Sequence, residues 1–133
     1  MIKIALKQNL AKEIKIDDTH SIVIEYPSIE QKQILDEILL TITLLDEELK
    51  KVKNPVELAK INAKKISLMH EFMKLTIRFC LKQVKGYDFN LELEGNQLDD
   101  KTFEAICYDV KQVTSLFELI SKEIEFNELD KKK

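Results

Sequence analysis

Apolar and polar residues alternate along the first 26 positions of the chain. Two runs, residues 14–16 and 22–24, place isoleucine at every second position, and the polar residues 17–20 separate them. Side chains of a β-strand point alternately to its two faces, so the pattern predicts a β-hairpin. Residues 1–6 alternate as well and can add a third strand. Because so small a ribbon is only marginally stable alone, we expect helices to cover one face of the ribbon at 1–26.

The apolar residues that follow recur with the period of a helix. From Leu35 onward their spacing alternates between three and four positions, which places them along one helix face: Leu35, Ile38, Ile42, Leu45, Leu49 and Val52. Ser28 stands where a helix cap is needed, and Gln31 three positions later completes the sequence of a capping box. These signals predict a helix over residues 28–53.

A second helix is predicted over residues 55–85. Asn54 suits the capping position, and Pro55 suits the first helical position, where its missing N–H costs nothing. Gly86 follows two lysines of the last predicted turn and suits the helix end. Apolar residues become dense in the second half of this segment, so that half is expected to be buried on most sides. The loop between the two helices is so short that they must form an antiparallel helical hairpin.

The rest of the chain predicts a loop or short strand and then a third helix. Residues 87–98 alternate only weakly and contain a glycine turn. Asp99 or Asp100 can cap a helix over residues 100–126, whose apolar residues again follow steps of three and four: Phe103, Ile106, Val110, Val113, Phe117, Ile120 and Ile124. Residues 127–133 are polar and are expected to form a frayed tail. The predicted fold class is α+β, predominantly α: a small N-terminal β-ribbon, a long helical hairpin and a C-terminal helix.

Composition limits the chain to one domain with few, long elements. The 133 residues are 44% hydrophobic and 34% charged, with a formal net charge of -3, two Gly and two Pro. This is enough apolar material for a core and too little net charge for a disordered acidic segment. No run approaches the about 18 apolar residues that span a bilayer, and the first residues lack the apolar centre of a signal peptide. We therefore expect no membrane association and a cytoplasmic location.

Motifs that would indicate an enzyme or a metal protein are missing from the sequence. Two glycines nearly exclude a glycine-rich phosphate loop, and no nucleophile elbow or paired-histidine motif is present. His20 and His70 have no second ligand at a metal spacing, and Cys80 and Cys107 lie among apolar neighbours, which favours core packing. One arginine, no tryptophan and an acidic balance argue against nucleic acid as a partner. We expect no catalysis, no metal and no cofactor.

A protein partner is the remaining hypothesis. Leu39, Leu40 and Leu44 widen the apolar surface of the first long helix beyond the needs of one seam, so we expect them to contact another protein. The second long helix carries lysines such as Lys60 and Lys64, either as a basic face for an acidic partner or as charges that complement acidic neighbours within the domain. The two seams can likewise form the core, bind a partner helix or support a homo-oligomer.

Three short segments between residues 84 and 103 follow one another in a distinctive order. Residues 84–87 (Val-Lys-Gly-Tyr) form a Gly-aromatic step, residues 94–95 (Glu-Gly) an acidic turn, and residues 97–103 the capped start of a helix. This order resembles the tail assembly chaperones of long-tailed bacteriophages and prophages. In those proteins a helical region ends in a Gly-aromatic step, an acidic turn follows, and a capped C-terminal helix closes the domain. A β segment before the first long helix is similar too.

The resemblance implies a non-enzymatic assembly factor in the bacterial host cell. It would bind the tape-measure protein and prevent its long helices from aggregating before the tail tube polymerises around them. Two other functions stay open. The chain can be a structural or adaptor subunit of a larger bacterial or phage complex, or an enzyme with an unfamiliar site at His70, Glu71 and Arg78, which share a helix face at near-helical spacing.

Overall fold

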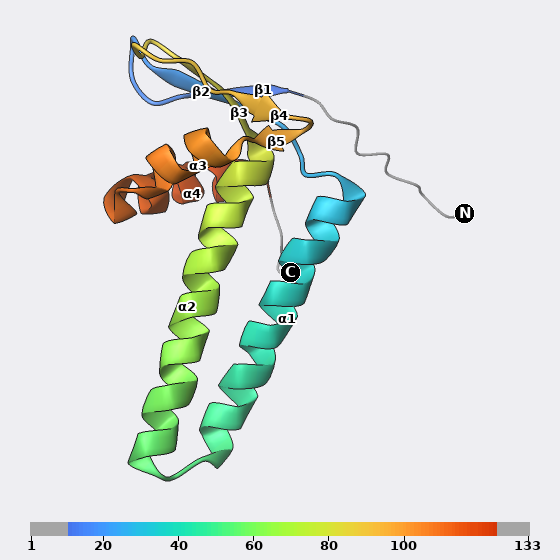
Figure 1. Ribbon diagram of the computed structural model, residues 1–133, viewed down its shortest axis with the longest axis vertical. Helices are drawn as coiled ribbons and strands as arrows, with labels where there is room; N and C mark the ends of the chain where they lie inside the picture. Colours follow the sequence, from blue (N-terminus) through green and yellow to red (C-terminus); the bar gives the residue numbers. More distant parts are fainter. Residues whose placement is uncertain (1–10, 125–133) are drawn as a thin grey trace, which may run out of the picture.

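A three-stranded antiparallel sheet, a small two-stranded sheet, a long helical hairpin and two shorter helices make up the computed structural model, which describes residues 11–124 (Figure 1). The fold is α+β and predominantly α, as the sequence predicts. In chain order the elements are β1 (Lys12–Lys15), β2 (Ser21–Ile24), α1 (Ile29–Lys51), α2 (Pro55–Cys80), β3 (Leu81–Lys85), β4 (Leu93–Glu94), β5 (Gln97–Leu98), α3 (Asp100–Cys107) and α4 (Val110–Glu123). Within residues 11–124, no helix is both long and apolar enough to cross a membrane.

The predicted β-hairpin is confirmed, but its third strand comes from a different part of the chain. β1 and β2 pair with Ile14 opposite Ile22, and β3 adds to the other edge of β2 with Val84 opposite Ile22. The strand predicted at residues 1–6 lies outside the described residues. The central strand β2 carries the buried side, because Ile22 and Ile24 are almost fully enclosed.

The second long helix ends five residues earlier than predicted, and its last segment is β3. The backbone of Leu81 is extended, with φ -76° and ψ 123°, and its side chain is fully buried. Pairing with β2 therefore overrides a helix-compatible sequence, since strand preference depends on distant neighbours. Lys82 and Lys85 consequently lie in a strand, although the Lys82 Nζ still donates to the carbonyl oxygen of Phe79 in the last helical turn, 2.9 Å away.

Gly86 does not cap a helix, contrary to the prediction, but it is needed for another reason. Its φ is +89°, a conformation that L side chains rarely adopt, and it follows β3. A Cβ at this position would lie 2.0 Å from the carbonyl oxygen of Thr19 in the turn between β1 and β2. The glycine thus allows two loops at the end of the sheet to pack directly on each other.

The predicted helix starts are confirmed by their capping geometry. Ser28 and Gln31 form a reciprocal capping box at α1, and the Oδ1 of Asn54 accepts from the amide of Val56 at α2, 2.8 Å away. The Oδ1 of Asp99 accepts from the amide of Thr102 at α3, also at 2.8 Å. Each cap satisfies amides that the first helical turn leaves without partners.

The helix predicted over residues 100–126 is two helices, because the chain turns at Tyr108 and Asp109. Asp109 has extended backbone and caps α4, its Oδ1 accepting from the amide of Lys111 at 2.9 Å. The continuous apolar spacing concealed this second cap. α4 ends at Glu123, and the predicted continuation to 126 and the tail at 127–133 lie outside the described residues.

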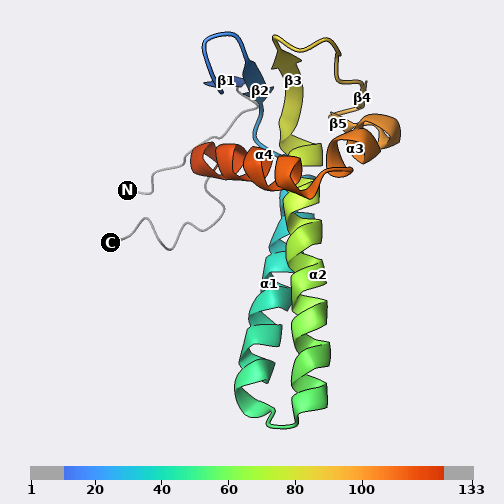
Figure 2. The ribbon, with the colours of Figure 1, turned by 90° about the vertical axis from the view of Figure 1, so that its left-hand side faces the viewer.

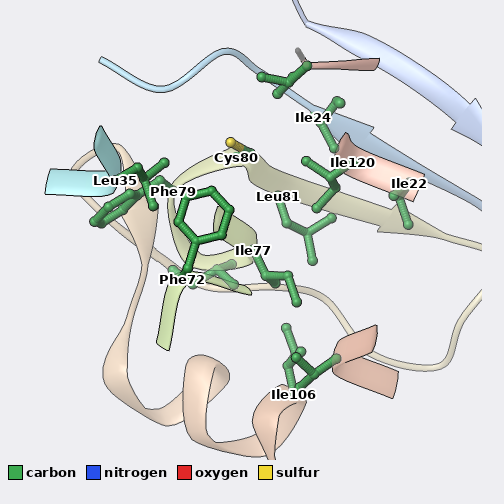
Figure 3. Close-up of a cluster of buried hydrophobic side chains, with 13 residues drawn as sticks. Ile22, Ile24, Leu35, Phe72, Ile77, Phe79, Cys80, Leu81, Ile106 and Ile120 are labelled. Carbon is green, nitrogen blue, oxygen red and sulfur yellow. The ribbon is translucent and has the colours of Figure 1, made fainter. Parts of the chain in front are cut away.

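The hydrophobic core lies at one end of the hairpin, where α2 meets the sheet. Figure 3 shows side chains from β2, β3, α2, α3 and α4 converging there, including Ile22, Ile77, Leu81, Ile106 and Ile120. The predicted burial of the second half of the long helix is confirmed for its last turns. We call residues 11–35 and 72–124 the head, and residues 36–71 the free hairpin. Figures 1 and 2 show the free hairpin extending beyond the head.

Candidate protein-interaction surface

Leu40 and Leu44 are the most exposed of the leucines that the sequence marks for partner binding. Each is 60% exposed, and they lie one turn apart near the middle of α1. Leu35 and Leu45, five positions before and after Leu40, are buried. At about 100° per residue, a separation of five positions places Leu40 on the opposite side of the helix. The two leucines therefore point away from the core and from α2.

Leu39 does not share this exposed position. It is half-buried and packs against the hydrophobic core cluster. The exposed residues near Leu40 and Leu44 on α1 include three acidic ones, Glu37, Glu47 and Glu48. The helix as a whole carries six acidic residues and three lysines. An exposed apolar pair in an acidic setting is the main feature of the outer side of α1.

Lys60 and Lys64 are exposed on α2 and form no ion pair with any residue between 11 and 124. Lys65, the next residue, faces α1, because its Nζ lies 2.5 Å from the Oδ1 of Asp46. Relative to Lys65, the side chains of Lys64 and Lys60 are turned about 100° and 140° around the helix. They therefore project away from the side of α2 that faces α1. Because Leu39 packs against the core, the five predicted binding residues do not form one exposed patch.

Two other basic residues of α2 are already used within the domain. Lys65 joins the two helices of the hairpin through Asp46. The guanidinium of Arg78 lies 2.5 Å from the Oδ1 of Asp100, donates to the carbonyl oxygen of Leu98 and sits 4.8 Å from the centre of the Phe103 ring. At these two positions the charges complement acidic neighbours of the same chain, which is one of the two interpretations that the sequence leaves open.

Ile66 and Met69 are exposed apolar residues that the sequence analysis assigned to the general apolar pattern of α2. They are 51% and 44% exposed. The less exposed positions of α2 recur at 58, 61, 65, 68 and 72, and position 65 is a lysine that faces α1. Ile66 and Met69 each follow one of these positions, which turns them away from α1. The lysine inside the seam is the sequence signal that could have identified them.

The three residues of the alternative enzyme hypothesis do not line one groove together. His70 and Glu71 border an open groove beside Phe103, whereas Arg78 is bound to Asp100 at the start of α3. Within residues 11–124, no three His, Cys, Asp or Glu side chains lie close enough together to hold a metal ion. The arrangement around Arg78 holds α3 against α2.

Both cysteines are free thiols, as the sequence predicts. Cys80 is fully buried in the core, and burial raises the pKa of its thiol to about 12. Cys107 is half-buried, and burial raises the pKa of its thiol as well. A raised pKa keeps a thiol protonated and unreactive at neutral pH. The buried position of Cys80 confirms its prediction as a packing residue.

Comparison with known protein families, with characterised proteins and with solved structures finds no match to this chain.

Proposed function

We propose that the chain is a non-enzymatic assembly factor whose free hairpin binds a helix of another protein. The observation that carries this proposal is the outward pair Leu40 and Leu44, each 60% exposed at the middle of a helix that extends beyond the head. Leucines at positions i and i+4 are the usual anchors for an amphipathic helix lying along another helix. The acidic surroundings favour a partner helix with basic residues beside its apolar stripe.

Within this class, we propose a tail assembly chaperone of a long-tailed bacteriophage or prophage, acting in the bacterial cytoplasm on the tape-measure protein. Support comes from the order of segments between residues 84 and 103. In the fold, Gly86 and Tyr87 follow β3, Gly95 forms a turn with φ +66°, and Asp99 caps α3. The strand β3 lies between the helical hairpin and the Gly-aromatic step. The resemblance read from the sequence had placed this step directly at the end of the helix.

The test is affinity purification of the tagged chain from its native host during particle production, with mass spectrometry of the co-purified proteins. The intact chain should recover one very long helical protein, and the double variant Leu40→Glu/Leu44→Glu should not. The matched control is Thr41→Glu/Thr43→Glu, which adds the same charge at exposed positions of the same helix. Equal recovery by both double variants would rule out this surface. A complex retained in finished particles would instead favour the structural-subunit alternative.

A further inference from the structure

The outer edge of β1 has no strand beside it among residues 11–124. β1 lies at one end of the strand order β1-β2-β3, with β2 on its other side (Figure 2). An unpaired edge presents a row of amide and carbonyl groups to which a further strand can add. The sheet has three strands, and β1 and β2 are four residues long, so further strands would strengthen it. The edge of β1 is therefore a candidate site for strand addition.

Two residues of β1 point their backbone groups toward this open edge. The amide of Ile16 donates to the carbonyl oxygen of His20, 2.9 Å away, across the hairpin of β1 and β2. Backbone groups alternate in direction along a strand, so those of Ile14 also face β2. Those of Glu13 and Lys15 consequently face the open edge, and both residues are exposed.

The other end of the hairpin gives the same assignment. The amide of Glu25 donates to the carbonyl oxygen of Cys80 on the β3 side, 2.9 Å away. By the same alternation, the backbone groups of Ile24 and Ile22 face β1. Because Ile22 lies opposite Ile14 in the register of the two strands, the backbone groups of Ile14 must face β2.

Charge complementarity selects one way of pairing this edge with a copy of itself. A two-fold axis perpendicular to the sheet places two β1 strands antiparallel, with the covered face of each sheet on the same side. Three registers pair the outward residues with each other. Glu13 opposite Glu13, or Lys15 opposite Lys15, brings like charges together, which is destabilising. The third register places Glu13 of each copy opposite Lys15 of the other, with Ile14 on the axis.

Glu13 and Lys15 have the capacity to make this contact. The carboxylate of Glu13 accepts from the Oγ of Ser21 at 2.8 Å and from the Nζ of Lys85 at 2.9 Å. A carboxylate offers about four acceptor positions, so it can accept from a third partner. Lys15 is exposed and forms no ion pair with any residue between 11 and 124. Its ammonium group is therefore available to the second copy.

The covered face of the sheet accepts this register. Ile14 meets Ile14 of the second copy in a pair without backbone hydrogen bonds, where side chains approach most closely. Ile16, which is 40% exposed, lies opposite Lys12 of the second copy, whose aliphatic stem can cover it. Lys12 forms an ion pair with Glu123 at the end of α4. With the axis at Ile14, the two α4 ends lie at opposite ends of the paired strands and stay apart.

We propose that two copies of this chain pair through the outer edges of β1, with Ile14 on the two-fold axis, so that two three-stranded sheets become one continuous antiparallel sheet. Each outward pair exchanges two backbone hydrogen bonds, so the two pairs supply four. Because so short an edge buries little area, the dimer depends on protein concentration. The pairing does not depend on the proposed function. It leaves Leu40 and Leu44 uncovered, and the dimer carries two free hairpins.

The first test measures the mass of the purified full chain by light scattering over a range of protein concentrations. The intact chain should approach twice 15.6 kDa as the concentration rises. Lys15→Pro removes an outward N–H, which an edge strand tolerates, so this variant should stay at 15.6 kDa with unchanged circular dichroism. Equal dimerisation of Lys15→Pro would overturn the proposal. So would a monomeric intact chain at every attainable concentration, whether the edge is then free or covered by residues 1–10 of the same chain.

The second test addresses the charges that select the register. Glu13→Lys and Lys15→Glu should each be monomeric alone, because each places like charges opposite each other at both contacts. Mixed in equal amounts, the two variants should dimerise, since every introduced charge then meets its opposite in the other variant. The controls are Glu104→Lys and Lys111→Glu, which make the same charge changes at exposed positions of α3 and α4 and should each dimerise like the intact chain. A mixture that stays monomeric would overturn the register.

The third test locates the axis by disulfide cross-linking. The variants Glu13→Cys, Ile14→Cys and Lys15→Cys are oxidised mildly, one at a time, beside the intact chain with its own Cys80 and Cys107. Only residue 14 meets its own copy, at a Cα separation of roughly 4.5 Å that a disulfide can bridge. Ile14→Cys should therefore give the covalent dimer and the intact chain none. Cross-linking mainly through residue 13 or 15, or through none of the three, would overturn the proposed pairing. No partner protein is present in these tests, so their failure would leave the proposed function untouched.

Discussion

The head and the free hairpin are built from the same kinds of apolar residue but differ in how many neighbours they bury. In the head, β2, β3, α2, α3 and α4 surround a common core in which Ile22, Ile77, Leu81 and Ile120 are fully enclosed. In the free hairpin, two helices touch along one seam and bury Leu45 alone. The comparison shows that a heptad pattern identifies a helix face without telling how many elements cover it. Stability is expected to be concentrated in the head, and recognition in the hairpin.

The largest predicted difference between the two regions concerns leucines of equal size. Leu81→Ala should lower the free energy of unfolding by about 2–5 kcal/mol, because it leaves a cavity in a closed core. Leu44→Ala should change it by less than about 0.5 kcal/mol, because the side chain is 60% exposed. Urea unfolding monitored by circular dichroism measures both. Similar losses for the two variants would mean that the free hairpin is as enclosed as the head.

The next effect tests how closely the loops of the head pack. Gly86→Ala should cost about 1–3 kcal/mol or more, because the residue has positive φ and its Cβ would meet the carbonyl oxygen of Thr19. Gly95→Ala should cost only about 1 kcal/mol, because Gly95 also has positive φ but no atom lies within 4 Å of its added Cβ. Equal costs in thermal unfolding would show that backbone strain alone matters and the close approach does not.

A smaller effect is expected from the ion pair that joins the two arms of the hairpin. Asp46→Asn removes the partner of Lys65 and should weaken the contact between the arms by about 0.2–1 kcal/mol. Amide hydrogen exchange should accelerate in residues 36–71 and stay unchanged in the head. Glu47→Gln is the control, because it removes the same charge from a pair within α1. Equal acceleration by both variants would assign the effect to net charge.

The smallest predicted effect is a pH dependence at the tip of the sheet. Hydrogen bonds from the amides of Thr19 and His20, together with the His20 ring, hold the pKa of Asp17 down at about 2. A depressed pKa stabilises the fold above the ordinary pKa of about 4 and loses that contribution as the pH falls toward 2. The stability difference between the intact chain and Asp17→Asn should therefore be constant above pH 5 and shrink below pH 4. A difference that stays constant down to pH 2 would contradict the assignment.

The sequence predicts those features that depend on nearby residues. The caps at Ser28, Asn54 and Asp99, the hairpin of β1 and β2 and the α+β class all follow from local spacing, and the structure confirms them. The end of α2 could not be predicted in this way, because residues 81–85 become a strand only through pairing with residues about 60 positions earlier. The break at Asp109 was concealed by apolar spacing that continues through it.

Only some of the exposed apolar residues of the hairpin could be identified from the sequence, because exposure also depends on distant parts of the chain. An apolar surface wider than one seam identified Leu40 and Leu44 correctly as residues beyond the needs of the α2 contact. The same criterion included Leu39, which the core covers, and it overlooked Ile66 and Met69. Which apolar residues stay exposed depends on which side of each helix the core and the other helix cover. That limit is a property of the tertiary structure.

Because α2 passes directly into β3, the free hairpin is rigidly connected to the sheet. Cys80 is the last helical residue and Leu81 the first of the strand, and the carbonyl oxygen of Cys80 accepts from the amide of Glu25 just after β2, 2.9 Å away. No flexible linker separates the arm from the sheet, so the hairpin cannot swivel independently. A load that tilts the tip would be transmitted to the edge strand of the sheet, and a molecule held on the arm keeps a fixed orientation relative to the head.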